Sequence, residues 1–139
     1  MDAFDADVLI YAAVPGHPLG RRVAALIASA EIRTPAGTGS VLLLPEVLGK
    51  PLRDGTAAEV RVLAALLARL DLRPVDLATA ELATSLAARY KLRAADAVHL
   101  ASAVGIGADR FITNNQRDFR RDITEVDVTY PADLADPGT

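Results

Sequence analysis

The chain has 139 residues, a formal net charge of −3 and no cysteine, and 51% of its residues are apolar. This length predicts a single domain with a substantial core, and the short, interrupted apolar runs exclude a membrane span. The absence of cysteine excludes a disulfide scaffold and, with an amino terminus unlike a signal peptide, predicts a soluble cytoplasmic protein. The negative net charge excludes a general attraction to nucleic acid, so such binding would need local clusters of arginine and lysine.

Short strands and helices are predicted to alternate through the first half of the chain. Residues 4–11 form a β-branched and aromatic run that predicts a buried first strand, with Asp5 and Asp7 inside it. A helix is predicted over 20–30 and a short strand over 32–35, followed by a turn-rich segment. Ser40 is placed to cap a helix over 40–52, with a kink at Pro45 and an end near Gly49 and Pro51. An amphipathic helix should begin at Thr56, where Glu59 completes a capping box.

The second half continues the same alternation. It predicts a strand over 72–76, helices over 77–90 (capped near Thr79) and 92–104, a strand at 111–112 that ends in a polar loop, and a last strand over 126–130. Short strands alternating with helices indicate an α/β domain whose mostly parallel sheet is covered on its faces. We expect this domain to span residues 1–133 and to be followed by a frayed tail over 134–139.

The helix predicted over 92–104 is apolar on nearly every face and carries one carboxylate, Asp96. Such a helix lies inside a fold, where an ionised carboxylate needs a compensating partner such as a divalent metal. An aspartate in a first turn also complements the helix dipole, which would explain Asp96 without a metal if the helix begins at Ala94 or Ala95. Glu46 is a second acid in an apolar setting.

Acidic or amide side chains from four separated segments could converge in one place, namely Asp5, Glu46, Asp96 and the loop with Asn115 and Asp118. In an open α/β sheet the functional crevice lies outside the carboxyl ends of the strands; the loop fits this rule, whereas Asp5 inside a strand fits it poorly. Carboxylate and amide oxygens are the ligands that Mg²⁺ and Mn²⁺ prefer, and a metal held there can activate water beside a phosphoryl group. Zinc, Walker A and dinucleotide motifs are absent from the sequence.

Four segments, in order and covering nearly the whole chain, resemble the PIN-domain toxin ribonucleases of the VapC type from bacterial toxin–antitoxin pairs. They are FDADVLIYA, SVLLLPEVL, LRAADAVHLASA and GADRFITNNQRDF. The resemblance implies a three-layer α/β/α fold and an endoribonuclease that depends on Mg²⁺ or Mn²⁺. It also implies a cognate antitoxin that inserts a segment into the site, and a homodimer.

Matched position by position, the resemblance assigns the family's first three acids to Asp5, Glu46 and Asp96. We expect Asp5 and Asp96 to bind the metal directly and Glu46 to act through water or to position the nucleophile. The supporting positions that match are Asp7, Ser40 and Thr113. The fourth acid departs from the commonest pattern, because Asn115 stands where aspartate is usual; Asp118 could replace it or merely cap the following turn.

His99 and several arginines are further candidate site residues. His99 lies on the same helix face as Asp96 and either contacts the substrate or is a packed core histidine. Arg93, Arg117 and Arg121 are the basic residues expected to contact RNA phosphate, while the others, Arg120 among them, are expected to be solvated surface.

Two other functions compete with the ribonuclease. One rival is a phosphatase like the haloacid dehalogenases, suggested by the DADVL start but lacking the later lysine and paired aspartates. The other is a PIN-like module without catalysis, which Asn115 supports.

Overall fold

A five-stranded parallel sheet forms the centre of the computed structural model, which describes residues 1–138. The strands are β1 (Asp2–Phe4), β2 (Gly37–Ser40), β3 (Leu70–Arg73), β4 (Arg110–Ile112) and β5 (Asp127–Thr129), in the spatial order β3-β2-β1-β4-β5. Each neighbouring pair is parallel, so the carboxyl ends of all five strands lie at one edge of the sheet. This is the edge at which ligands bind in open α/β sheets.

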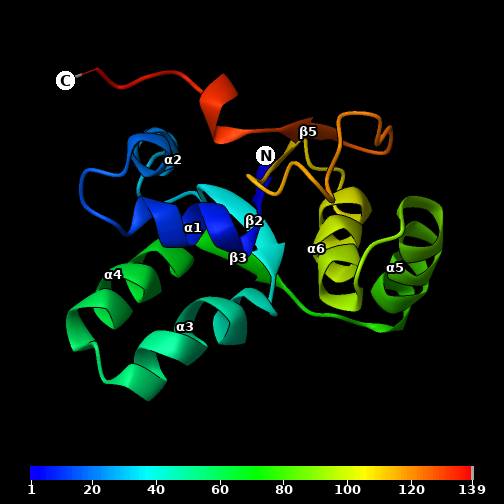
Figure 1. Ribbon diagram of the computed structural model, residues 1–139, viewed down its shortest axis with the longest axis horizontal. Helices are drawn as coiled ribbons and strands as arrows, with labels where there is room; N and C mark the ends of the chain where they lie inside the picture. Colours follow the sequence, from blue (N-terminus) through cyan, green and yellow to red (C-terminus); the bar gives the residue numbers. More distant parts are fainter. Residues whose placement is uncertain (139) are drawn as a thin grey trace.

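Helices cover both faces of the sheet and complete three layers (Figure 1). They are α1 (Ala6–Ala12), α2 (Pro18–Ala28), α3 (Leu43–Asp54), α4 (Ala57–Leu67), α5 (Leu77–Tyr90) and α6 (Ala94–Gly105), with a short 3₁₀ helix at Pro131–Asp133. Helices α5 and α6 pack together on one side, and α1 to α4 gather on the other. Among residues 1–138 no helix is long and apolar enough to cross a bilayer.

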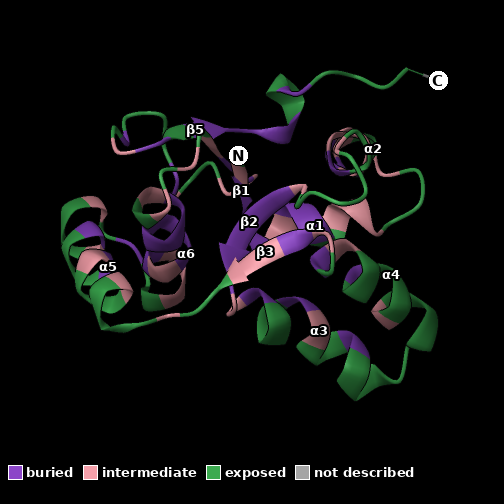
Figure 2. Ribbon diagram, turned by 180° about the vertical axis from the view of Figure 1, so that it is seen from behind, coloured by how far each residue is buried: buried purple, intermediate pink, exposed green. Residues whose placement is uncertain are grey.

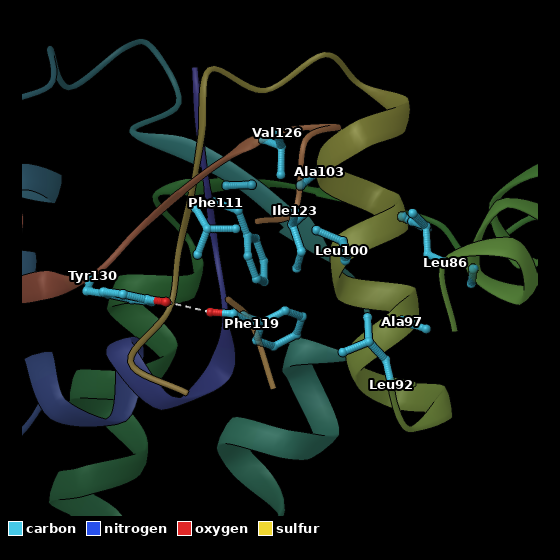
Figure 3. Packing of buried hydrophobic residues seen from close by; sticks show 14 residues of the cluster. Leu86, Leu92, Ala97, Leu100, Ala103, Phe111, Phe119, Ile123, Val126 and Tyr130 are labelled. Atoms are coloured by element: carbon cyan, nitrogen blue, oxygen red, sulfur yellow. Dashed lines mark hydrogen bonds between the residues drawn. The ribbon is translucent and has the colours of Figure 1, made fainter. Parts of the chain in front are cut away.

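Two hydrophobic cores form because successive residues of a strand point to opposite faces of the sheet. Ala3 and Phe111 pack with α5 and α6, while the next residues, Phe4 and Ile112, pack with α1 to α4. Figure 2 shows β2 buried in the middle of the fold, whereas β3 at the edge of the sheet is only partly buried. Figure 3 shows the first core, in which the Phe119 ring lies edge-on to Phe111 at 5.0 Å. The expectation of an α/β/α fold is confirmed.

The prediction of a first strand over 4–11 is wrong. Strand β1 ends at Phe4, and residues 6–12 form α1 instead. A short apolar run suits a buried helix as well as a buried strand, and here the Asp5 side chain caps a helix by accepting a hydrogen bond from the Ala6 N–H at 2.8 Å. Asp5 therefore directly follows β1 at the carboxyl edge of the sheet. It thus agrees with the rule that the functional crevice lies at this edge.

The prediction of a strand over 32–35 is also wrong. Ile32 is 90% exposed, and the strand is the glycine-rich segment that the sequence indicated as a turn, Gly37–Ser40. Glycine is needed because a Cβ atom on Gly37 would lie 2.4 Å from Cε2 of Phe4 on the neighbouring strand. The next strand begins at Leu70 rather than at residue 72.

Helix α3 differs from its prediction at both ends. It begins at Leu43, after Ser40 has ended β2, so Pro45 lies in the first turn, where its missing N–H costs no helical hydrogen bond and the predicted kink loses its cause. The helix continues through Pro51 and ends at Gly55, whose φ of 72° is left-handed.

The remaining helices agree better with their predictions. Helix α5 has the predicted bounds, although Asp76 caps it by accepting from the Thr79 N–H at 2.9 Å. The α4 capping box is wrong, because the Thr56 hydroxyl donates to the Glu59 carboxylate and to the Pro51 carbonyl oxygen, both at 3.2 Å, and does not cap the first N–H groups of the helix.

The carboxyl-terminal segment is partly packed against the domain. Leu134 is buried, and Arg22 of α2 donates a hydrogen bond to its carbonyl oxygen at 2.6 Å. Thr139 lies outside the described residues. The boundary at residue 133 and the frayed tail stay predictions.

Candidate active site

Asp5 is the most deeply buried acid at the carboxyl edge of the sheet, at 5% exposure. Its two oxygens accept hydrogen bonds from the Ala6 N–H and from the Thr113 hydroxyl, both at 2.8 Å. Burial raises the pKa of Asp5, and the charge of Glu46 adds to this, although His99 and the two hydrogen bonds act in the opposite direction. The Asp5 carboxylate, which directly follows β1, is therefore held in place by hydrogen bonds while burial disfavours its charge.

Asp7 lies two residues later, in the first turn of α1, and only one of its carboxylate oxygens has a hydrogen-bond partner. One carboxylate oxygen accepts from the Asn114 N–H at 3.0 Å, while the other is buried and has no hydrogen-bond partner in the described structure. Burial, followed by the charge of Asp5, raises the pKa of Asp7 to about 7. A buried, unpartnered carboxylate oxygen is costly unless a proton or a cation satisfies it.

Asp96 reaches the same place from the opposite layer. It lies in the first turn of α6 and is half-buried. Burial raises the pKa of Asp96, and the charges of Asp5, Asp118 and Glu46 raise it further, whereas His99 lowers it. The structure therefore brings together the acids that the sequence singled out, as neighbours that repel one another.

Glu46 and His99 form a pair between α3 and α6. Oε2 of Glu46 lies 2.9 Å from Nε2 of His99, and the histidine is only 2% exposed. Nδ1 of His99 is buried without a partner in residues 1–138, so a hydrogen on Nε2 gives the less costly tautomer. His99 is thus a packed, hydrogen-bonded histidine that also holds the Glu46 carboxylate.

The loop after β4 holds Asn115 and Asp118, the two candidates for the fourth position, in contact with each other. The Asn115 side chain spans the loop: its Oδ1 accepts from the Asp118 N–H at 3.3 Å, and its Nδ2 donates to Asp118 Oδ2 at 3.1 Å. The Asn115 N–H also donates to the Thr113 hydroxyl at 3.1 Å. Asp118, held in this way, is the loop residue whose charge acts on Asp96.

The other predicted positions lie around this cluster with different roles. Ser40 is buried at the end of β2, where its hydroxyl accepts from the Leu42 N–H at 3.1 Å and so stabilises the turn into α3. Arg93 is exposed at the start of α6, and Arg117 lies 3.5 Å from the Asp118 carboxylate. Arg121 is engaged elsewhere, because it donates to Asp133 at 2.6 Å and lies over the Tyr130 ring. Lys91, which the sequence did not single out, and Arg120 line a cavity beside Asp118. Both are exposed, as the sequence predicted for Arg120.

The donor chemistry of the cluster fits a hard divalent cation. Its acids offer carboxylate oxygens, the ligands that Mg²⁺ and Mn²⁺ prefer, and the unpartnered oxygen of Asp7 is a position that a cation could satisfy. In residues 1–138 no three carboxylate or histidine side chains are already arranged as a ready ligand set.

The family model of the PIN domain matches residues 3–122 of the chain. The chain belongs to the PIN domain family. Its fold is similar to that of a toxin–antitoxin complex from Klebsiella pneumoniae, with 27% identity, a TM-score of 0.73, and coverage of 94% of this chain and 98% of that one. No curated protein matches the chain by sequence.

Two more distant structures share the PIN fold. One is VapBC2 from Rickettsia felis bound to a DNA fragment from the promoter, with 17% identity, a TM-score of 0.69 and coverage of 93% and 97% of the two chains. The other is FitAB bound to an IR36 DNA fragment, with 19% identity, a TM-score of 0.72 and coverage of 99% and 100%. The resemblance to VapC-type PIN proteins is confirmed, and the phosphatase alternative loses its basis.

Proposed function

We propose that this PIN protein is an Mg²⁺- or Mn²⁺-dependent endoribonuclease that serves as the toxin of a bacterial toxin–antitoxin pair. The observation that carries the proposal is the convergence of Asp5, Glu46, Asp96 and Asp118 at the carboxyl edge of the sheet. PIN domains are generally nucleases, and the Klebsiella pneumoniae structure that this chain resembles is a toxin–antitoxin complex.

The proposed metal ligands are Asp5 and Asp96 directly, with Glu46 acting through water. A bound Mg²⁺ or Mn²⁺ would supply Lewis-acid chemistry for phosphodiester hydrolysis and would offset the mutual repulsion of the carboxylates. Support comes from the raised pKa values of Asp5 and Asp96 and from the orphaned oxygen of Asp7. Asp118, rather than Asn115, is proposed to supply the fourth negative charge, with Asn115 fixing its orientation.

The neighbouring side chains position these acids. The Thr113 hydroxyl holds one oxygen of Asp5, and His99 holds one oxygen of Glu46. The Glu46 side chain is 35% exposed, which leaves its second oxygen open to water. We propose that Glu46 accepts a proton from the attacking water.

The comparison with the Klebsiella pneumoniae toxin–antitoxin complex supports a cognate antitoxin as the partner. We also propose a homodimer acting in the cytoplasm, which rests on the resemblance to VapC-type toxins. Exposed Arg93 and Arg117 are the proposed RNA contacts nearest the acids, whereas the ion pair of Arg121 with Asp133 favours a structural role for that residue.

The test is cleavage of a structured RNA pool by antitoxin-free protein in Mg²⁺, in Mn²⁺ and in EDTA. We expect metal-dependent cuts at a few sites that Asp96→Asn abolishes while the protein stays folded. Asp54→Asn, which changes an exposed carboxylate at the end of α3, is the matched control and should cleave normally. Full metal-dependent cleavage by Asp96→Asn would refute the site assignment.

A binding module without catalysis is the second candidate, and Asn115 favours it because the site has one acid fewer than the commonest pattern. Its signature would be a folded protein that binds metal and RNA but does not cut. Restoring the acid with Asn115→Asp would then be expected to create cleavage. If the unmodified protein cleaves, this candidate is excluded.

A further inference from the structure

A cavity of about 220 Å³ opens beside the acidic cluster, on the side of Asp118. We call it the basic cavity, and its charged lining residues are Arg89, Lys91, Asp118, Arg120 and Asp122. Three are cations and two are acids, and one of those acids, Asp118, also acts on Asp96 in the candidate active site. The basic cavity and the acidic cluster therefore share one residue, Asp118.

The walls of the basic cavity are firmly anchored. On one side the α5 helix ends at Lys91, whose φ of 56° is left-handed, and the next residue, Leu92, is buried in the core. On the other side Arg120 follows Phe119, whose ring is buried and whose carbonyl oxygen accepts from the Tyr130 hydroxyl at 2.7 Å (Figure 3). A site built on such fixed backbone loses little freedom when a ligand binds.

The cations of the cavity differ in how far they are compensated. Arg89 lies 3.5 Å from the Glu125 carboxylate. Lys91 and Arg120 are exposed, and neither has an ion-pair partner within 4.0 Å among residues 1–138. Two uncompensated cations thus lie next to a cluster of like-charged acids, where a polyanion needs a positive surface to approach.

We propose that the basic cavity binds a backbone phosphate of the RNA next to the one that is cleaved, with Lys91 and Arg120 as its ligands. This inference rests on the proposed ribonuclease function. A strand whose scissile phosphate lies at the acids carries further phosphates past Asp118 and into the cavity. An acidic peptide of the antitoxin is the rival occupant, and its binding is one outcome of the test.

The first experiment measures binding of labelled single-stranded RNA to the full-length Asp96→Asn protein in Mg²⁺ at several salt concentrations. Lys91→Ala with Arg120→Ala should weaken binding about tenfold or more at low salt and should lower the slope of log affinity against log salt by about 0.7 to 1.4, the release expected for one to two phosphate contacts. The matched control removes two exposed cations from α3 and α4, by Lys50→Ala with Arg61→Ala, and should change neither quantity.

Two further variants separate charge from structure. Lys91→Gly removes the charge while relieving the left-handed backbone, so it should fold well and still weaken binding. Asp122→Asn removes a negative charge from the cavity and should tighten binding, an effect that a merely structural residue would not give. In the cleaving protein, the Lys91 and Arg120 double variant should raise KM and leave kcat nearly unchanged.

The outcomes distinguish this inference from the function on which it rests. If the unmodified protein neither cuts nor binds RNA, the proposed function fails. If it does both and the double variant behaves like the control, the basic cavity is not a phosphate site. Loss of antitoxin affinity with unchanged RNA binding would overturn the inference in favour of an acidic peptide.

Discussion

Thr113 shows how a single buried hydroxyl can set the chemistry of the site. It is fully buried, donates to Asp5 and accepts from the Asn115 N–H. Its hydrogen bond lowers the pKa of Asp5 against the effect of burial. The hydroxyl therefore favours the ionised form of Asp5 and also shapes the loop that carries Asp118.

Thr113→Val should move the acid limb of the pH–rate profile to higher pH, because losing the hydrogen bond raises the pKa of Asp5. It should also destabilise the fold by about 1–3 kcal/mol, since it leaves buried polar groups unpaired. Thr38→Val is the control: it removes a buried hydroxyl that donates to the Asp71 carbonyl oxygen at 2.8 Å, away from the acids. Both variants should unfold at lower denaturant concentration, and an unshifted profile for Thr113→Val would contradict the proposed role.

The Glu46–His99 pair leads to a prediction about stability that does not depend on activity. Glu46→Ala should lower the free energy of unfolding by about 1–3 kcal/mol, because it leaves His99 buried with both ring nitrogens unpartnered. Glu81→Ala, on the exposed face of α5, should change it by less than about 0.5 kcal/mol. Equal urea midpoints for the two variants would show that the pair contributes nothing.

At the scale of elements, the position of α1 depends on how closely α2 packs against it. Gly20 of α2 is buried against the backbone of α1, and a Cβ atom there would lie 2.0 Å from the carbonyl oxygen of Tyr11. Helix α1 carries Asp7 and is capped by Asp5. The contact between α1 and α2 thus holds α1, the helix that follows Asp5, in position.

Gly20→Ala should destabilise the protein by about 1–3 kcal/mol, because the obstructing atom belongs to the backbone and cannot swing away. Gly49→Ala, in the middle of α3 with no atom within 4 Å of the added Cβ, should instead stabilise by about 0.5–1 kcal/mol. Thermal melts of the two variants should therefore shift in opposite directions. A melting temperature for Gly20→Ala at or above that of the parent would disprove the close contact.

At the scale of the whole molecule, the acidic cluster makes stability depend on pH. The folded-state pKa values of Asp5, Asp7 and Asp96 are raised, that of Asp7 to about 7. The folded protein therefore binds more protons than the unfolded chain between about pH 4 and pH 7, so its stability falls as the pH rises through this range.

In EDTA, we expect the free energy of unfolding to drop by about 1–3 kcal/mol between pH 5 and pH 8, a shift in melting temperature of several degrees. Mg²⁺ should raise the melting temperature more at pH 8 than at pH 5, because ionised carboxylates bind the cation. Melting curves across this range, with and without Mg²⁺, make the comparison. Stability that is flat or rises toward pH 8 in EDTA would contradict the crowded cluster.

The sequence by itself determined the class of fold, the long helices and the identity of the acids. Local sequence patterns located α5 and α6, and the acids at 5, 46 and 96 stood out because each lies in an apolar run. These features are local, so they can be read along the chain. The four segments that resemble PIN proteins added the expectation that the acids meet.

Tertiary structure alone decided the features that depend on contacts between distant residues. Whether 6–12 is strand or helix, and whether Gly37–Ser40 is turn or strand, depended on packing against neighbouring layers, because both segments are locally ambiguous. The orphaned oxygen of Asp7 and the placement of Lys91 and Arg120 beside Asp118 join segments far apart in sequence. Burial and electrostatic repulsion act through space, and for that reason the chemistry of the site became visible only in the folded chain.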